Sequence, residues 1–189
     1  MQRIAICSTA FSGSTLLCLM LGKHSEISNV GEIHKYHIIN HDTKCHFHEN
    51  CYLNFKKKDF ERVTFNQFDT KVVDRIKNNE SVKYIVSKGL YGLKFDKAIL
   101  LFKKPEALCF SEMSHRKTSI EDAINYYINK NNNILKELKD SNIPYLSVYY
   151  EDLAENTERV MNRICKYLDI SFEPQILDPF DEETNKENN

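Results

Sequence analysis

The sequence lacks the features that mark a membrane protein or a general nucleic-acid binder. No apolar run in its 189 residues approaches the roughly 20 residues that a membrane-spanning helix needs. The formal net charge is −1, so an anion site must come from local clustering of donors rather than from a basic surface. The first residues, Met1-Gln2-Arg3, lead into an apolar stretch and do not resemble a signal peptide. We therefore expect a cytoplasmic protein that binds no nucleic acid.

Three common phosphate-binding signatures are also absent. There is no G-x-x-x-x-G-K-[ST] loop and no G-x-G-x-x-G pattern. The tyrosine-phosphatase pattern, a cysteine followed six residues later by arginine, fails because Gly13 stands six residues after Cys7. The missing lysine of the first pattern counts against a nucleotide-dependent kinase, which remains an alternative.

What is present is an ordinary globular composition, with 41% hydrophobic and 28% charged residues. The length favours one domain, which we place at 1–180, with an irregular insertion at about 33–68 and a polar tail at 181–189. Six cysteines are scattered along the chain and four lie in apolar segments, so most are expected to be buried thiols rather than a disulfide framework.

The first informative stretch runs from Ile4 to Leu17. Its apolar start predicts a buried strand, and the apolar spacing from Leu16 onward predicts a helix. Between them lie small residues, with Gly13 allowing close backbone approach and three hydroxyl residues, Ser12, Ser14 and Thr15, adding donors. Backbone N–H groups and the helix dipole at such a turn favour a phosphate or sulfate, although hydroxyl residues also serve as plain helix caps.

Strands and helices alternate along the rest of the chain. Strands are predicted at 27–30, 82–86, 98–102 and 145–150, and helices at 69–79, from Pro105, from Ser119 and from Glu151 to Leu168. Ser119 to Asp122 resembles a capping box. The segment 98–102 is apolar throughout, which is typical of a parallel strand covered on both faces. This alternation predicts an α/β protein whose ligands bind at the carboxyl ends of parallel strands.

The insertion contains a cysteine and histidine cluster. Cys45, His48 and Cys51 are spaced as soft metal ligands can be. Reduced cysteines that pack a loop are the favoured interpretation, a metal site is the weaker one, and a disulfide is not expected in the cytosol.

Three stretches, in order, resemble the sulfotransferase family. A-F-S-G-S-T-L-L, from Ala10, is similar to the start of its nucleotide-binding segment, which continues to a G-E pair that Gly31 and Glu32 match. The segment from Leu100 to Ser111 resembles its 3′-phosphate segment, with Pro105 and Ser111 at the family's spacing. Tyr149-Tyr150-Glu151-Asp152-Leu153 resembles its Y-E-D-L element.

The resemblance implies a three-layer α/β fold with a parallel sheet, flanking helices and a P-loop-like loop. It also implies binding of 3′-phosphoadenosine 5′-phosphosulfate (PAPS), with 3′,5′-ADP as product. The loop that holds the 5′-phosphosulfate then corresponds to 11–15, that is Phe11, Ser12, Gly13, Ser14 and Thr15. Lys103 falls on the family's arginine, and Ser111 on its serine, that hold the 3′-phosphate. The alternative interpretation of Lys103 and Lys104 is a solvated pair of surface lysines.

Glu32 resembles the glutamate that acts as the catalytic base in tyrosylprotein-type members. Phe11 is a departure, because most members carry Arg or Lys there to neutralise the leaving group. Lys88 resembles a lysine of some bacterial members and is the first candidate for the missing charge, ahead of Lys23 and His34. A structural carboxylate and a solvated lysine are the alternatives for Glu32 and Lys88.

The predicted function is therefore sulfuryl transfer from PAPS to a hydroxyl or amine of a small-molecule, carbohydrate or peptide acceptor. Because of Phe11, a non-catalytic PAPS- or PAP-binding module is an alternative. The acceptor pocket is expected in the insertion, where the pattern is weakest.

Overall fold

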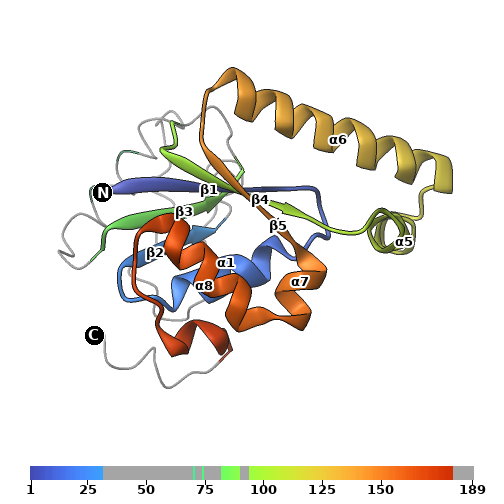
Figure 1. Cartoon of the computed structure of the whole chain (residues 1–189). Coiled ribbons are helices and arrows are strands. Elements are labelled where there is room, and N and C mark those ends of the chain that lie inside the picture. Colours follow the sequence, from blue (N-terminus) through green and yellow to red (C-terminus); the bar gives the residue numbers. More distant parts are fainter. Residues whose placement is uncertain (32–69, 71–73, 75–81, 90–93, 181–189) are drawn as a thin grey trace, which may run out of the picture.

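The computed structural model describes residues 1–31, 70, 74, 82–89 and 94–180. In this part of the chain a parallel sheet has the strand order β2-β3-β1-β4-β5 (Figure 1). Its strands are β1 (Gln2–Ser8), β2 (Ile27–Gly31), β3 (Tyr84–Lys88), β4 (Lys97–Phe102) and β5 (Tyr145–Tyr149). The central strand β1 pairs with β3 on one side and β4 on the other, so the chain changes direction across the sheet at β1. In α/β sheets such a switch point is where ligands bind.

Alternate residues of the central strands enter two separate cores. Ile4 and Ile6 of β1 pack with residues of α1 and α8, whereas Ala5 and Cys7 pack with residues of α6. All four side chains are buried, which explains why the inner strands carry apolar residues without alternation. The fully apolar segment near residue 100 is confirmed as such a strand.

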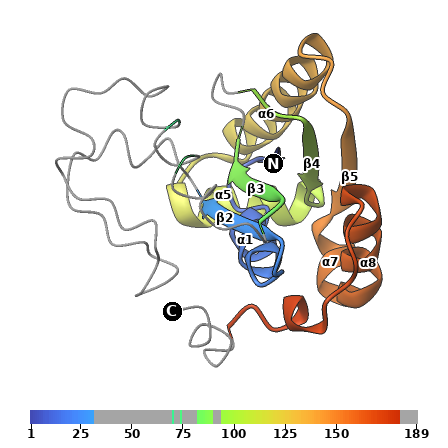
Figure 2. The ribbon, with the colours of Figure 1, turned by 90° about the vertical axis from the view of Figure 1, so that its left-hand side faces the viewer.

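Helices cover both faces of the sheet, so the three-layer arrangement is confirmed. In Figure 2, α6 lies on one side of the strands and α7 and α8 lie on the other. The α5 helix follows β4 and packs against α6. The elements are α1 (Ser14–Gly22), α5 (Pro105–Arg116), α6 (Ile120–Asp140), α7 (Tyr150–Glu155), α8 (Thr157–Leu168) and the 3₁₀ turn η1 (Pro174–Leu177).

Local sequence signals account for where the helices begin. Pro105 is the first residue of α5, as expected of a residue with no backbone N–H. Ser119 caps α6, and its Oγ accepts the backbone N–H of Asp122 at 3.1 Å. The cap that the sequence predicts is therefore confirmed, with Ser119 Oγ also donating to the carboxylate of Asp122 at 2.7 Å.

The single helix predicted from Glu151 to Leu168 is wrong, because the structure has two helices. Asn156, with φ −133° and ψ 48°, ends α7 and precedes α8. Asparagine competes with helical hydrogen bonds and favours helix ends. The apolar spacing continues from Leu153 to Val160 across the break, so periodicity alone could not reveal it. The preceding strand also ends one residue earlier than predicted, since Tyr150 already belongs to α7.

Cys7, Cys18, Cys109 and Cys165 are buried free thiols, as predicted. Burial raises the pKa of the Cys7 thiol from 9.0 to about 12. The insertion at 33–68 and the tail at 181–189 lie outside the described residues, as do Cys45, His48 and Cys51. Of the helix predicted over 69–79, only Thr70 and Asp74 are described, and both are helical. None of the helices in the described ranges combines the length and apolar character of a membrane crossing.

Candidate functional site

The loop between β1 and α1 is shaped by a close contact at Gly13. Gly13 has φ 81°, a left-handed conformation that side chains rarely adopt. A Cβ at this position would lie 2.4 Å from two carbons of the Tyr150 ring, which therefore packs directly against the backbone. Both the dihedral angle and the ring require glycine here.

The N-terminus of α1 is left without a protein cap. Gly13 is its N-cap residue, no side chain makes a capping hydrogen bond, and the first turn contains no acidic residue. The N–H groups of the first turn and the positive end of the dipole are thus available to an anion. Thr15 is exposed, whereas Ser12 is fully buried and its Oγ is hydrogen-bonded to Thr9 Oγ1 at 2.5 Å. Ser12 therefore faces the protein with its hydroxyl and can offer an anion only its backbone.

Lys103 joins the loop to α5. Its Nζ donates to Ser111 Oγ and to the backbone oxygen of Phe11, each at 3.2 Å. Ser111 Oγ donates in turn to the carbonyl of Ala107 at 2.9 Å, which orients the hydroxyl. Lys103 and Ser111, which the resemblance assigns to the 3′-phosphate, are therefore in direct contact. They lie beside the loop that it assigns to the 5′-phosphosulfate.

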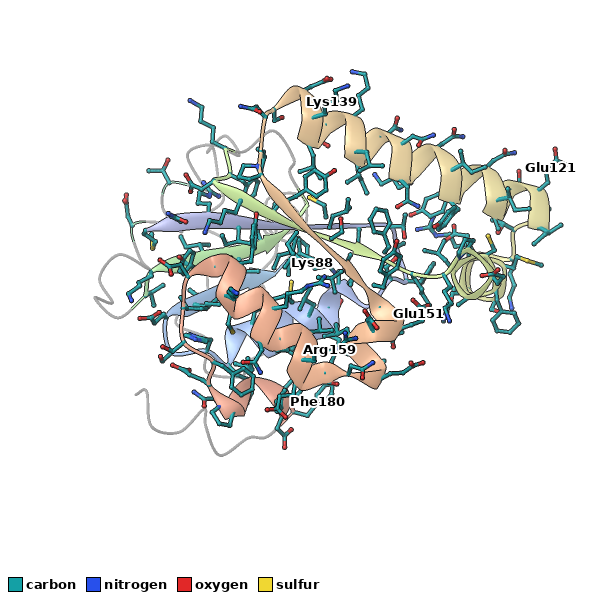
Figure 3. The ribbon with its side chains drawn as sticks, viewed as in Figure 1. Lys88, Glu121, Lys139, Glu151, Arg159 and Phe180 are labelled. Carbon is teal, nitrogen blue, oxygen red and sulfur yellow. The ribbon has the colours of Figure 1, made fainter. Side chains whose placement is uncertain are left out.

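The start of α7 supports both the loop at Gly13 and the Lys103–Ser111 pair. The Lys103 Nζ lies 5.3 Å from the centroid of the Tyr150 ring, a cation–π distance. Glu151 Oε1 accepts the backbone N–H of Lys104 at 3.0 Å, and Figure 3 shows Glu151 where β5 passes into α7. The family resemblance in the sequence included Tyr150 and Glu151 but gave neither residue a role. Tyr150 underlies Gly13 and Lys103, and Glu151 fixes the backbone that begins α5.

Lys88 reaches the loop from the neighbouring strand. It is the last residue of β3, and its Nζ donates to Thr15 Oγ1 at 3.0 Å. Lys23 follows α1 at the end remote from the loop, about 13 Å away for nine helical residues. Of the two candidates for the missing loop charge that lie among the described residues, Lys88 and Lys23, Lys88 is the one that contacts the loop. Glu32 and His34 lie outside the described residues.

Phe11 turns its ring away from the loop and toward α5. It adopts φ 60°, and its ring stacks on that of His115 at 4.7 Å between centroids with 15° between planes. The guanidinium carbon of Arg116 lies 5.5 Å from the same ring. No motif marked His115 or Arg116 in the sequence, because their partner is brought to them only by folding.

The chain matches the sulfotransferase domain family over residues 1–189. It belongs to this family. The loop, Lys88, Lys103 and Ser111 therefore lie within a sulfotransferase domain.

Solved sulfotransferase structures share the fold. The sulfotransferase domain of the Synechococcus PCC 7002 olefin synthase is 24% identical with a TM-score of 0.62, over 97% of this chain and 79% of that chain. The sulfotransferase domain from the curacin biosynthetic pathway is 20% identical with a TM-score of 0.61, over 96% and 78%. A mouse sulfotransferase complexed with PAP is 12% identical with a TM-score of 0.55, over 93% and 61%. Among curated protein sequences, none matches the chain.

Proposed function

We propose that this sulfotransferase binds PAPS and transfers its sulfuryl group to a hydroxyl or amine. The observation that carries the proposal is the position of Lys103, whose Nζ contacts both Ser111 and the backbone of the loop. A single anion would need only the loop. Two adjoining groups of anion-binding residues fit a nucleotide that carries phosphates at both its 3′ and 5′ positions.

The residues present fit such a nucleotide. The uncapped N-terminus of α1 offers backbone donors for the 5′-phosphosulfate, and Gly13 allows it to approach closely. The ammonium of Lys103 and the hydroxyl of Ser111 would hold the 3′-phosphate by charge-assisted hydrogen bonds. When bound, PAPS supplies an activated sulfuryl group and leaves as 3′,5′-ADP.

The chain's own groups have two further tasks in this reaction. A base must take the proton of the acceptor as its oxygen or nitrogen bonds to sulfur, and Glu32, which follows the last residue of β2, is the proposed base. A cation must stabilise negative charge on the phosphate oxygen as its bond to sulfur breaks. Lys88, held beside Thr15, is the proposed cation.

The proposal is tested by calorimetry with 3′,5′-ADP and 5′-AMP. We expect a marked preference for 3′,5′-ADP, and Lys103→Met should reduce that preference about 10- to 100-fold, since a hydrogen bond between charged groups contributes roughly 1.5–3 kcal/mol. Lys104→Met is the matched control, because its side chain is exposed and the bond to Glu151 uses its backbone. Equal affinity of the unmodified protein for both nucleotides would contradict the proposal.

A non-catalytic binding module is the second candidate, favoured by the direction of Phe11. Its ring lies against α5, so the loop itself contributes no cation to a leaving group. Transfer from labelled PAPS separates the candidates: binding of 3′,5′-ADP without turnover in the presence of many acceptors supports the module. A kinase would instead show ATP competing with 3′,5′-ADP.

The acceptor is proposed to be a small molecule, a carbohydrate or a peptide. Screening acceptors for a sulfuryl mass shift identifies its class. The cytoplasmic location stays a prediction.

A further inference from the structure

Arg116, the last residue of α5, is held by three groups at once. Its Nη1 forms an ion pair with Glu112 Oε1 at 2.8 Å. Its guanidinium carbon lies 5.5 Å from the Phe11 ring centroid and 5.2 Å from that of Tyr126. Glu112 is only 2% exposed, so this ion pair is fixed on one side by a buried carboxylate. A planar guanidinium suits this environment because it stacks on aromatic faces and still donates hydrogen bonds.

Both aromatic partners of Arg116 are attached to the loop between β1 and α1. Tyr126, on α6, accepts the backbone N–H of Ala10 with its hydroxyl at 3.0 Å. Phe11 belongs to the loop itself and adopts φ 60°, a left-handed conformation that persists in a residue with a side chain only where the surrounding structure holds it. Arg116 therefore connects α5 and α6 to the two residues that precede Ser12 and Gly13.

We propose that Arg116 is a positioning residue that, with Phe11 and Tyr126, holds the loop in its anion-binding shape. The inference rests on the proposed nucleotide site and adds to it a group that the family resemblance did not indicate. In this arrangement Phe11 contributes no cation to the loop. Its ring instead fixes the loop to α5, and other residues supply the positive charge.

The contacts of Arg116 favour positioning over direct contact with phosphate. The ion pair with Glu112 already balances the charge of the guanidinium, and the two rings restrict its movement. The second carboxylate oxygen of Glu112 has no hydrogen-bond partner in the described part of the chain, so loss of Arg116 would leave a buried charge without compensation. For this reason a milder variant, Tyr126→Phe, accompanies the Arg116 variants. It removes only the hydroxyl that holds Ala10.

The first test measures amide hydrogen exchange of loop residues 9–13 in the protein without nucleotide. We expect exchange to be about tenfold faster in Arg116→Gln and several-fold faster in Tyr126→Phe. Arg159→Gln is the control, because Arg159 lies on α8, where Figure 3 labels it, and its ion pair at 3.1 Å is with Asp152 of α7. Loop exchange as slow as in the unmodified protein in both variants would overturn the proposal.

The second test measures the Kd for 3′,5′-ADP in the same variants, together with Arg116→Lys. We expect the Kd to rise about tenfold in Arg116→Gln. Arg116→Lys should not restore it, because an ammonium lacks the planar surface with which a guanidinium contacts both rings. A Kd that lysine restores fully would mean that charge alone matters and would overturn the positioning role. A lower melting temperature and fewer binding sites, with an unchanged Kd, would indicate a purely structural role. That result would also overturn the proposal.

The two proposals fail separately. If the unmodified protein binds no 3′,5′-ADP, the nucleotide function is refuted, and with it the claim that Arg116 serves nucleotide binding. The exchange measurement would still show whether Arg116 holds the loop.

Discussion

Single residues decide where this site obtains its positive charge. Phe11 occupies the loop position where the family resemblance led us to expect Arg or Lys, and its ring faces α5. Lys88 comes from another strand and reaches Thr15 at the same loop. Positive charge at the transition state contributes to rate more than to ground-state binding. Lys88 should therefore affect turnover and binding differently.

We predict that Lys88→Ala lowers sulfuryl transfer at least about 100-fold, the effect of removing one oriented donor at an oxyanion. The Kd for 3′,5′-ADP should stay within about threefold of its original value, because the nucleotide keeps its backbone donors and Lys103. Single-turnover transfer from labelled PAPS and calorimetry measure the two quantities. Lys94→Ala, at an exposed position before β4, is the control. Unchanged turnover in Lys88→Ala would remove Lys88 from the mechanism.

The loop residues themselves could be found from sequence, because Ser12 to Thr15 lie together and form a recognisable pattern. Lys103, Ser111 and Lys88 were found by resemblance and prove to contact one another or the loop. Arg116 and Tyr126 could not be found this way. Their importance arises from contacts with Phe11 and Ala10, which are far from them in the chain, and arginine or tyrosine on a helix is ordinary in itself.

At the scale of elements, the junction of β5 and α7 forms the floor beneath the loop. The Tyr150 ring touches the backbone at Gly13 and lies below Lys103. The Y-E-D-L resemblance matched this element but assigned it no part in the site. Periodicity, however, merged α7 with α8, so the sequence did not show that Tyr150 begins a short separate helix.

We predict that Gly13→Ala destabilises the protein by about 2–5 kcal/mol, combining the left-handed backbone with an overpacked contact. Urea denaturation measures the loss. In Gly13→Ala/Tyr150→Ala the contact is relieved but the dihedral angle is not, so the cost of adding the methyl group should fall to about 1–2 kcal/mol relative to Tyr150→Ala alone. A Gly13→Ala protein as stable as the original would show that the loop can move away from the ring.

For the whole molecule, the buried thiols on the two faces of the sheet link stability to pH. Burial raises the pKa of Cys7 to about 12 and that of Cys165 to about 11, from 9.0. Below pH 9 both thiols are neutral in the folded and unfolded states. Above pH 9 the unfolded chain loses these protons while the folded protein keeps them, so stability falls as pH rises.

We therefore predict that the free energy of unfolding decreases from pH 9 to pH 11, and that the decrease is shallower in Cys7→Ala/Cys165→Ala. Urea denaturation at several pH values, compared as slopes rather than absolute stabilities, separates this effect from the cavities that the alanines create. Slopes that are identical in the two proteins would rule out a contribution of the thiols.

The alternation of elements was sufficient to predict a parallel α/β sheet, but not its strand order. That order depends on which strands pair, a long-range property: β1 pairs with β3 and β4 and not with β2, the next strand in the chain. It is this pairing that brings Thr15, Lys88 and Lys103 together at one edge.

The floor formed by Tyr150 has a consequence for the order of events during synthesis. The loop between β1 and α1 is made before the other four strands of the described sheet, yet the ring beside Gly13 comes from the residue after the last of them. Arg116 and Tyr126 also come much later than Ala10 and Phe11. A nascent chain thus carries the loop long before anything holds it, and we expect nucleotide to be recruited only after β5 has paired with β4. A nucleotide bound after that point would stabilise β1 and β5 together, although they are made at different times.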